Sequence, residues 1–366
     1  MLNNKKRLSK KFIISCLVVN FVLISVGLIF YKNYIPKLAI YKSIIETPIV
    51  GVAGVPKYLG ETRNYDKIFK ELRDNGFSTY MAFSQYAEHP EAKSLASDAD
   101  FFPPCNPTDS QWKAMRDNNI KLIIPGYVIF DDYFESMTSD DPLQELIDCI
   151  GRDLIFGVTN YDEPAGGLWD GSLTKHDLYT VYRKTKEVDP TIPVLMVHAP
   201  FYASNPVEGI DYLYPTPKER DKYFRLVKEA SEYADIVGFD IYPIPLGFGG
   251  GLTSPSLDGK HITDVKSAII DYLTWIKSEV PGKTYLVTLQ GFNFAMQYED
   301  NFVPEGVSIA DIKTLRNPTF KELEDMAKSA IEGGALVLLW WGQTHITSQD
   351  ASLWEDIKIV SKNIAN

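Results

Sequence analysis

Two adjacent acidic residues stand where an apolar segment of the sequence ends abruptly. Residues 157–167 read GVTNYDEPAGG and follow the apolar run Leu154-Ile155-Phe156, so Asp162 and Glu163 come directly before a proline. Two carboxyl groups can do acid–base chemistry when one is protonated and the other ionised. The alternative is a solvated turn whose carboxylates favour a nearby helix N-terminus. The elements around this segment decide between the two.

Eight apolar segments predict β-strands. They are continuous apolar runs rather than alternating ones, as expected when both faces of a parallel sheet are covered. The segments are 48–53, 77–84, 121–129, 153–161, 192–198, 235–242, 284–291 and 335–342.

Amphipathic stretches with helix start signals separate these strands. Thr319 with Glu322 has the pattern of a capping box, and the residues after Thr108 and Thr216 have similar patterns. Further helices are expected over 66–75, 174–189, 263–279 and 350–363. Eight strands, each followed by a helical stretch, predict an α/β fold, the (β/α)8 TIM barrel.

The N-terminal segment differs in composition from the rest. Residues 1–11 carry five basic side chains, and residues 12–31 form an uncharged apolar run that is long enough to cross a bilayer as a helix. Because a basic flank stays cytoplasmic, we expect a transmembrane signal anchor at 12–31, a linker at 32–47, and a barrel at 48–366 outside the cytoplasm, in the periplasm or at the cell surface. If the apolar segment is instead a cleaved signal peptide, the protein is secreted.

Charge and cysteine content limit the partners. The formal net charge of −11 disfavours nucleic acid as a partner, since an acidic surface repels phosphate. The chain has three cysteines and no CxxC or Cys/His cluster, so no structural zinc is expected. Whether Cys105 and Cys149 pair stays open, as does the oligomeric state. No cofactor and no metal are expected.

The strand ends bring chemistry-bearing residues to one face. In a TIM barrel the loops that follow the strands form the C-terminal face, where active sites lie. Long loops follow four of the strands, at 87–107, 200–214, 243–260 and 292–317. The polar and aromatic residues at strand ends are Tyr127, Tyr161, Asp162, Glu163, His198, Asp240, Tyr242, Gln290, Trp340 and Trp341.

These residue types fit glycoside hydrolysis. That reaction needs one protonated carboxyl group and one ionised carboxylate beside the scissile bond, and aromatic rings against which sugar faces pack. We expect Glu163 to be the general acid/base, because carboxylate neighbours would raise its pKa. Asp162 or Asp240 would hold the second role. Substrate contacts are expected from Tyr127, Tyr161, His198, Tyr242, Gln290, Trp340 and Trp341.

Three short motifs resemble those of the superfamily of (β/α)8 glycosidases. They are NYDEP at strand four, GFDIYP at strand six and LLWWG at strand eight. In the retaining members an acid/base glutamate precedes a proline at the end of strand four, commonly as Asn-Glu-Pro. Here Glu163-Pro164 matches and Asp162 replaces the asparagine. The resemblance covers roughly residues 48–360 and implies cleavage of glycosidic bonds in an extracytoplasmic poly- or oligosaccharide.

One position departs from that resemblance. Those families place a nucleophilic glutamate at the end of strand seven, where this chain has Gln290, and a neutral amide cannot act as that nucleophile. Glu299 follows in a loop and is not expected to replace it. Asp162 or Asp240 could then supply the second carboxylate, or the substrate could supply its own nucleophile. The third possibility is a barrel that binds glycans without cleaving them.

Several site residues have a structural alternative. His198 fits a hydrogen-bonded structural histidine, Asp240 fits a buried aspartate bonded to loop amides, and Tyr242 fits core packing. Adjacent strand residues face opposite ways, so only one of the two tryptophans of LLWWG should face the site. Glu163, His198 and Asp240 end three consecutive strands, so a metal-dependent barrel enzyme is a further alternative.

Overall fold

The computed structural model describes the residues from 48 onward in seven segments. These segments are 48–81, 110–126, 142–201, 217–246, 252–255, 260–297 and 315–365. The chain divides into two compact units, Met1–Glu46 and Thr47–Asn366, and all described residues belong to the second. The expected anchor at 12–31 lies outside them. Within the described segments, no helix combines the length and the apolar character that crossing a membrane requires.

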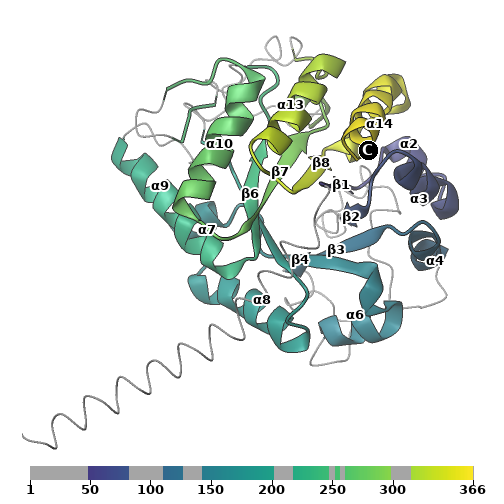
Figure 1. Ribbon diagram of the computed structural model, residues 1–366, viewed down its shortest axis with the longest axis horizontal. Helices are drawn as coiled ribbons and strands as arrows, with labels where there is room; N and C mark the ends of the chain where they lie inside the picture. Colours follow the sequence, from purple (N-terminus) through teal and green to yellow (C-terminus); the bar gives the residue numbers. More distant parts are fainter. Residues whose placement is uncertain are drawn as a thin grey trace, which may run out of the picture. The chain divides into compact units, whose positions relative to one another are not determined.

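Eight parallel strands close into a barrel, with helices packed around it (Figure 1). Each strand pairs with the next, and β8 pairs with β1 through the register Val50↔Leu338. This confirms the predicted TIM barrel, with strands shorter than the apolar segments. The strands are β1 (Ile49–Ala53), β2 (Thr79–Met81), β3 (Lys121–Pro125), β4 (Ile155–Thr159), β5 (Val194–His198), β6 (Ile236–Ile241), β7 (Thr284–Gln290) and β8 (Val337–Trp341).

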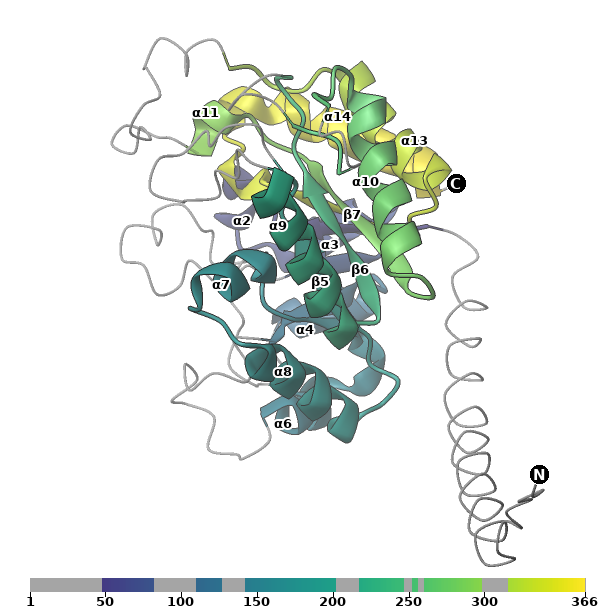
Figure 2. The ribbon, with the colours of Figure 1, turned by 90° about the vertical axis from the view of Figure 1, so that its left-hand side faces the viewer.

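Helices connect the strands along the outside of the barrel (Figures 1 and 2). Thr319 forms the predicted capping box with Glu322, and Thr174 forms another with Asp177. The α-helices are α2 (Lys57–Gly60), α3 (Tyr65–Asp74), α4 (Ser110–Asp117), α6 (Pro142–Ile150), α7 (Pro164–Asp170), α8 (Lys175–Val188), α9 (Pro217–Ala230), α10 (Val265–Glu279), α11 (Phe294–Gln297), α13 (Phe320–Glu332) and α14 (Ala351–Ala365).

Two apolar layers follow from the alternation of side chains along the strands. A small inner cluster fills the barrel and includes Leu195, Ile236 and Leu286. A larger cluster lies between the strands and the helices and takes the neighbouring positions, such as Phe239 and Ile241 on β6. Because Asp240 stands between Phe239 and Ile241, its side chain faces the inside of the barrel.

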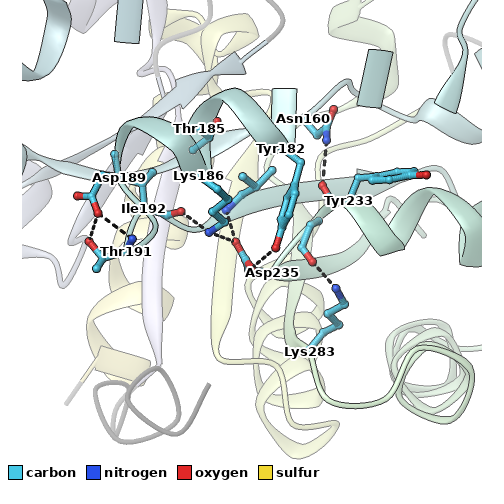
Figure 3. Close-up of polar contacts among 12 residues, drawn as sticks. Asn160, Tyr182, Thr185, Lys186, Asp189, Thr191, Ile192, Tyr233, Asp235 and Lys283 are labelled. Carbon is cyan, nitrogen blue, oxygen red and sulfur yellow. Dashed lines mark hydrogen bonds and ion pairs between the residues drawn. The ribbon is translucent and has the colours of Figure 1, made fainter. Parts of the chain in front are cut away.

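A polar network fastens α8 to the starts of β5 and β6 (Figure 3). Asp235 accepts a hydrogen bond from the backbone N–H of Val194 at 2.8 Å, and its carboxylate lies 2.5 Å from Lys186 Nζ. Lys186 Nζ also donates to the carbonyl oxygen of Ile192 at 2.6 Å. The network lies at the N-terminal ends of the strands, the end of a barrel where stability rather than chemistry is concentrated.

Candidate active site

Glu163 has a strained backbone at the end of β4. Its φ of 44° lies in the left-handed region, which residues other than glycine rarely adopt. The residue is the N-cap of α7, with Pro164 at the first helical position, and its N–H donates to the carbonyl oxygen of Val197 on β5 at 3.2 Å. Such strain persists only where the surrounding structure enforces it, and it is concentrated at functional sites.

Asn160 fixes the chain just before this turn. Its side-chain amide donates to the carbonyl oxygens of Leu178 at 3.1 Å and Tyr233 at 3.0 Å, and its Oδ1 accepts from the N–H of Tyr161 at 2.9 Å. The amide thereby ties the end of β4 to α8 and to the segment after α9. Sequence reasoning included Asn160 in the NYDEP motif without giving it this positioning role.

The carboxyl groups of Glu163 and Asp240 are hydrogen-bonded to each other. We call these two groups the carboxyl pair. Asp240 comes from β6 and is 6% exposed, and its Oδ1 is buried without a hydrogen-bond partner in the described part of the chain. A buried acceptor without a partner is costly, so an unpartnered carboxyl oxygen beside a second carboxyl group indicates a binding or catalytic site.

The surroundings of the carboxyl pair favour a proton shared between the two groups. Burial raises the pKa of Glu163, while the hydrogen bond that Asp240 donates to it lowers that pKa. The pKa of Asp240 is raised well above its usual value, first by burial and then by the negative charge of Glu163. The shared proton therefore resides mainly on Asp240, and Glu163 accepts the hydrogen bond that Asp240 donates. The expected rise in the pKa of Glu163 is present, but its cause is burial rather than the neighbouring carboxylates.

Asp162, the residue before Glu163, is a third acidic group, and its charge acts on the carboxyl pair. Surrounding protein atoms displace water from it and raise its pKa to about 7, and the charge of Glu163 adds to this rise. Its side chain is nevertheless exposed, so the solvent that still reaches it moderates the shift. Three acidic groups with raised pKa values at one barrel end are a mark of a functional site.

Aromatic rings from β6, β7 and β8 gather at the same barrel end. Tyr242 stacks on Trp341 with ring centroids 5.6 Å apart and an interplanar angle of 22°. Phe292 meets both rings edge-on, at 5.1 Å from each. Tyr242 and Trp341 are only half-buried, so part of their surface remains available for a ligand.

His345 joins this aromatic group and was not identified from the sequence. Its ring lies 6.0 Å from that of Trp341, and burial lowers its pKa to about 4, so the imidazole is neutral at pH 7. Its Nε2 is buried and has no hydrogen-bond partner in the segments that the structure describes. The only available signal was its position four residues after the end of β8.

Two expected substrate contacts lie instead in the layer between strands and helices. Trp340 is 1% exposed, and its Nε1 donates to Ser361 Oγ on α14 at 2.9 Å. His198 is fully buried, and its Nε2 lies 2.9 Å from Ser231 Oγ, while burial lowers its pKa to about 3. Both therefore follow the structural alternative, and Trp341 is the strand-eight tryptophan at the site.

Gln290 is part of the scaffold rather than a free site group. Its Nε2 donates to the carbonyl oxygens of Ile244 at 2.7 Å and Phe292 at 3.1 Å, and its Oε1 accepts from the N–H of Ile244 at 2.8 Å. The amide thus binds the chain after β6 to the end of β7. A glutamate could not donate these bonds, which explains physically why an amide stands here.

The remaining sequence expectations divide into three groups. Tyr161 is half-buried and packs against the layer between strands and helices. Tyr127 and Glu299 lie outside the described residues. The metal set of Glu163, His198 and Asp240 does not assemble, because His198 faces the helices. Over the described segments, no three His, Cys, Asp or Glu side chains gather into a possible metal site.

Comparisons with known proteins identify no family. No protein-family model matches the sequence, and no curated protein matches it. Similar solved structures include a candidate α-L-fucosidase from Bacteroides thetaiotaomicron, with a TM-score of 0.49, 11% identity, and coverage of 87% of this chain and 97% of that chain. A tryptophan synthase from M. tuberculosis has a TM-score of 0.46, 10% identity, and coverage of 90% and 97%.

A chitinase from Chromobacterium violaceum is a third similar structure, with a TM-score of 0.42, 11% identity, and coverage of 86% of this chain and 99% of that chain. Glycosidases and a synthase of unrelated activity are thus similar to this chain at comparable levels. TM-scores below 0.5 at such identities carry no argument about function.

Proposed function

We propose that this protein hydrolyses glycosidic bonds, with Glu163 as general acid/base. The observation that carries the proposal is the hydrogen-bonded carboxyl pair of Glu163 and Asp240 at the C-terminal ends of β4 and β6. The half-buried rings of Tyr242 and Trp341 supply flat apolar surface of the kind that sugar faces pack against. A carboxyl group that can donate a proton and an aromatic surface at the same barrel end are what cleavage of a sugar acetal requires.

The proton moves within the carboxyl pair in this mechanism. When a sugar displaces water from the site, the proton passes from Asp240 to Glu163, which then delivers it to the oxygen of the leaving group. Where the first step forms a glycosyl intermediate, Glu163, now ionised, removes a proton from the water that hydrolyses this intermediate. Asp240 is the proton partner of Glu163 rather than a group on the opposite face of the sugar.

The close contact within the pair limits the second role. The two working carboxyl groups of a retaining glycosidase lie about 5–5.5 Å apart, and those of an inverting enzyme about 6.5–9.5 Å apart. Directly hydrogen-bonded groups are closer than either, so Asp240 does not fit as nucleophile. Gln290 is engaged with the chain after β6. Attack on the sugar carbon therefore falls to Asp162, to a water that it activates, or to a group of the substrate.

An extracytoplasmic location fits this function. Cys149, in α6, forms a disulfide bond whose partner lies outside the described residues. Disulfides persist in oxidising compartments and are rare in the cytosol. Together with the basic and apolar N-terminal sequence, this supports a barrel that is anchored outside the cytoplasm, or secreted, and that meets polysaccharide there.

Substitution of Glu163 by glutamine tests the proposal. We expect Glu163→Gln to lower the turnover of oligosaccharides by about 10²–10⁴-fold, since an amide cannot donate a proton as a carboxyl group does. Turnover is measured by reducing-end release on a panel of neutral and acidic oligosaccharides, with circular dichroism as the check on the fold. A folded Glu163→Gln variant with wild-type turnover would refute the assignment.

A glycan-binding barrel without catalysis is the second candidate. The observation that favours it is the engagement of Gln290 at the position where related barrels carry a nucleophile. This candidate predicts saturable binding of an oligosaccharide with no product formed. Binding with no turnover by the wild-type protein across the panel would select it over hydrolysis.

A further inference from the structure

A hollow on the outside of the barrel is lined by charged residues and a tryptophan that take no part in the proposed reaction. It measures about 520 Å³ and lies between α7 and α9, which Figures 1 and 2 place next to each other. We call it the α7–α9 groove. Its lining residues are Trp169, Lys218, Glu219, Asp221, Lys222 and Arg225.

Three cations line this groove from one face of α9. Lys218, Lys222 and Arg225 follow the spacing i, i+4, i+7, which places them along one side of a helix. None of the three forms an ion pair with another described residue, although Glu219 and Asp221 also border the groove. A lysine in the first turn opposes the helix dipole, so helix stability does not account for Lys218.

An aromatic side chain forms the opposite wall. Trp169, near the end of α7, is half-buried and packs against the layer between strands and helices, which fixes its position. Lys222 Nζ lies over the ring of Trp169, 3.4 Å from its centroid, and this cation–π contact holds the ammonium against that face of the indole. The indole thereby orders one of the three cations in the groove, and a cluster of ordered cations suits a sugar that carries an acidic group, because the cations meet its charge.

The groove lies close along the chain to the carboxyl pair. Glu163 is the N-cap of α7 and Trp169 stands six residues later in the same helix, a rise of about 9 Å along the helix axis. A polymer that occupied the site at Glu163 could reach the groove with a neighbouring unit. The net charge of the whole chain is −11, so an acidic polymer needs a local cationic surface of this kind to bind.

We infer that the α7–α9 groove binds the carboxylate-bearing units of an acidic glycan and serves as an outlying subsite for the substrate. The substrate class is therefore a uronate-containing oligo- or polysaccharide. The role of the groove as a substrate subsite rests on the proposed function, whereas the binding of an acidic glycan to the groove does not depend on that function.

Titration calorimetry with oligogalacturonate, oligomannuronate and a neutral cello-oligosaccharide of equal length tests the groove. We expect binding of at least one uronate oligomer and weaker binding of the neutral one. The triple variant Lys218→Gln/Lys222→Gln/Arg225→Gln should lose at least tenfold in affinity, and Trp169→Ala should lose a similar factor. The control Lys67→Gln/Lys121→Gln/Lys328→Gln, with the same charge change at exposed positions elsewhere, should bind as wild type does.

The possible outcomes separate this inference from the proposed function. Binding of neither uronate oligomer, equal binding of the neutral oligomer, or an equal loss in the control variant would overturn the groove assignment. If inorganic tripolyphosphate displaces the uronate oligomer completely and Trp169→Ala does not change the affinity, the groove is a simple anion site, and this result would also overturn the assignment. Groove-dependent binding by a protein without turnover would support the groove while refuting hydrolysis.

Discussion

At the scale of single residues, the site contains features that cost stability. Glu163 has a left-handed backbone, and Asp240 buries a carboxyl oxygen without a described partner. Buried acidic groups beside one another also disfavour ionisation of each other. Residues selected only for the fold would not accumulate such costs at one strand end, so this arrangement favours a chemical role over a solvated turn.

The carboxyl pair predicts a pH-dependent stability difference for Asp240→Asn. The pKa of Asp240 is raised in the folded protein, so above about pH 4 the unfolded chain releases a proton that the folded chain keeps. The free energy of unfolding of the wild type should therefore fall as pH rises from about 4 toward the raised pKa. The variant lacks this titration and should gain in Tm relative to wild type over that range.

Calorimetric melting of both proteins between pH 4 and pH 8 measures the effect. The two Tm values should be closest at pH 4 and should diverge as pH rises, with Asp240→Asn the higher. A constant difference across the range, or a variant that falls behind as pH rises, would contradict the raised pKa of Asp240.

At the scale of elements, the ends of β6 and β7 are held together by one amide. Gln290 makes three hydrogen bonds to the backbone of Ile244 and Phe292. The register of β6 and β7 places Asp240 beside Thr288, two residues before this clamp. The clamp therefore stabilises the loop that follows the strand of Asp240.

Gln290→Glu tests the clamp. A carboxylate would face two carbonyl oxygens in a fully buried position, so the free energy of unfolding should fall by about 3 kcal/mol or more, with no gain in turnover. Urea unfolding measures it, and Gln349→Glu, the same change at an exposed position, should stay within about 0.5 kcal/mol of wild type. A stable Gln290→Glu protein with increased turnover would show that this position is the nucleophile site.

The elements were predictable to different extents. Long apolar runs and capping residues such as Thr319 identified the strands and most helices, because each signal is local. Helix α7 was missed, since its seven residues begin at a proline and include two glycines. Helix α6 was missed as well. Inside strands, alternation predicted that the adjacent tryptophans diverge, but which of them faces the site depends on strand orientation, a property of the closed sheet.

At the scale of the whole molecule, barrel closure assembles the site. Glu163 and Asp240 are far apart in sequence, and the closed sheet brings the ends of β4 and β6 to one barrel end. Because that rule is general, the sequence predicted this convergence. It did not predict the direct hydrogen bond between the two groups, the role of Gln290 or the proximity of His345, since these depend on side-chain geometry across several strands.

The disulfide of Cys149 predicts a redox-dependent stability of the whole barrel. A disulfide restricts the unfolded chain, so its reduction should lower the free energy of unfolding by about 2–4 kcal/mol. Thermal melts with and without reductant measure this loss, and Cys149→Ser should melt at the same temperature in both conditions. A wild-type protein that does not respond to reductant would contradict a stabilising disulfide.

The most direct test of the central claim compares leaving groups. A general acid matters most when the leaving group is a poor one, such as a sugar alcohol, and little when it departs without protonation, as dinitrophenolate does. We therefore expect Glu163→Ala to lower the rate of oligosaccharide hydrolysis by about 10²-fold or more relative to wild type. The same variant should hydrolyse the corresponding dinitrophenyl glycoside at nearly the wild-type rate. An equal loss on both substrates, or no loss on either, would contradict the role of Glu163 as the acid.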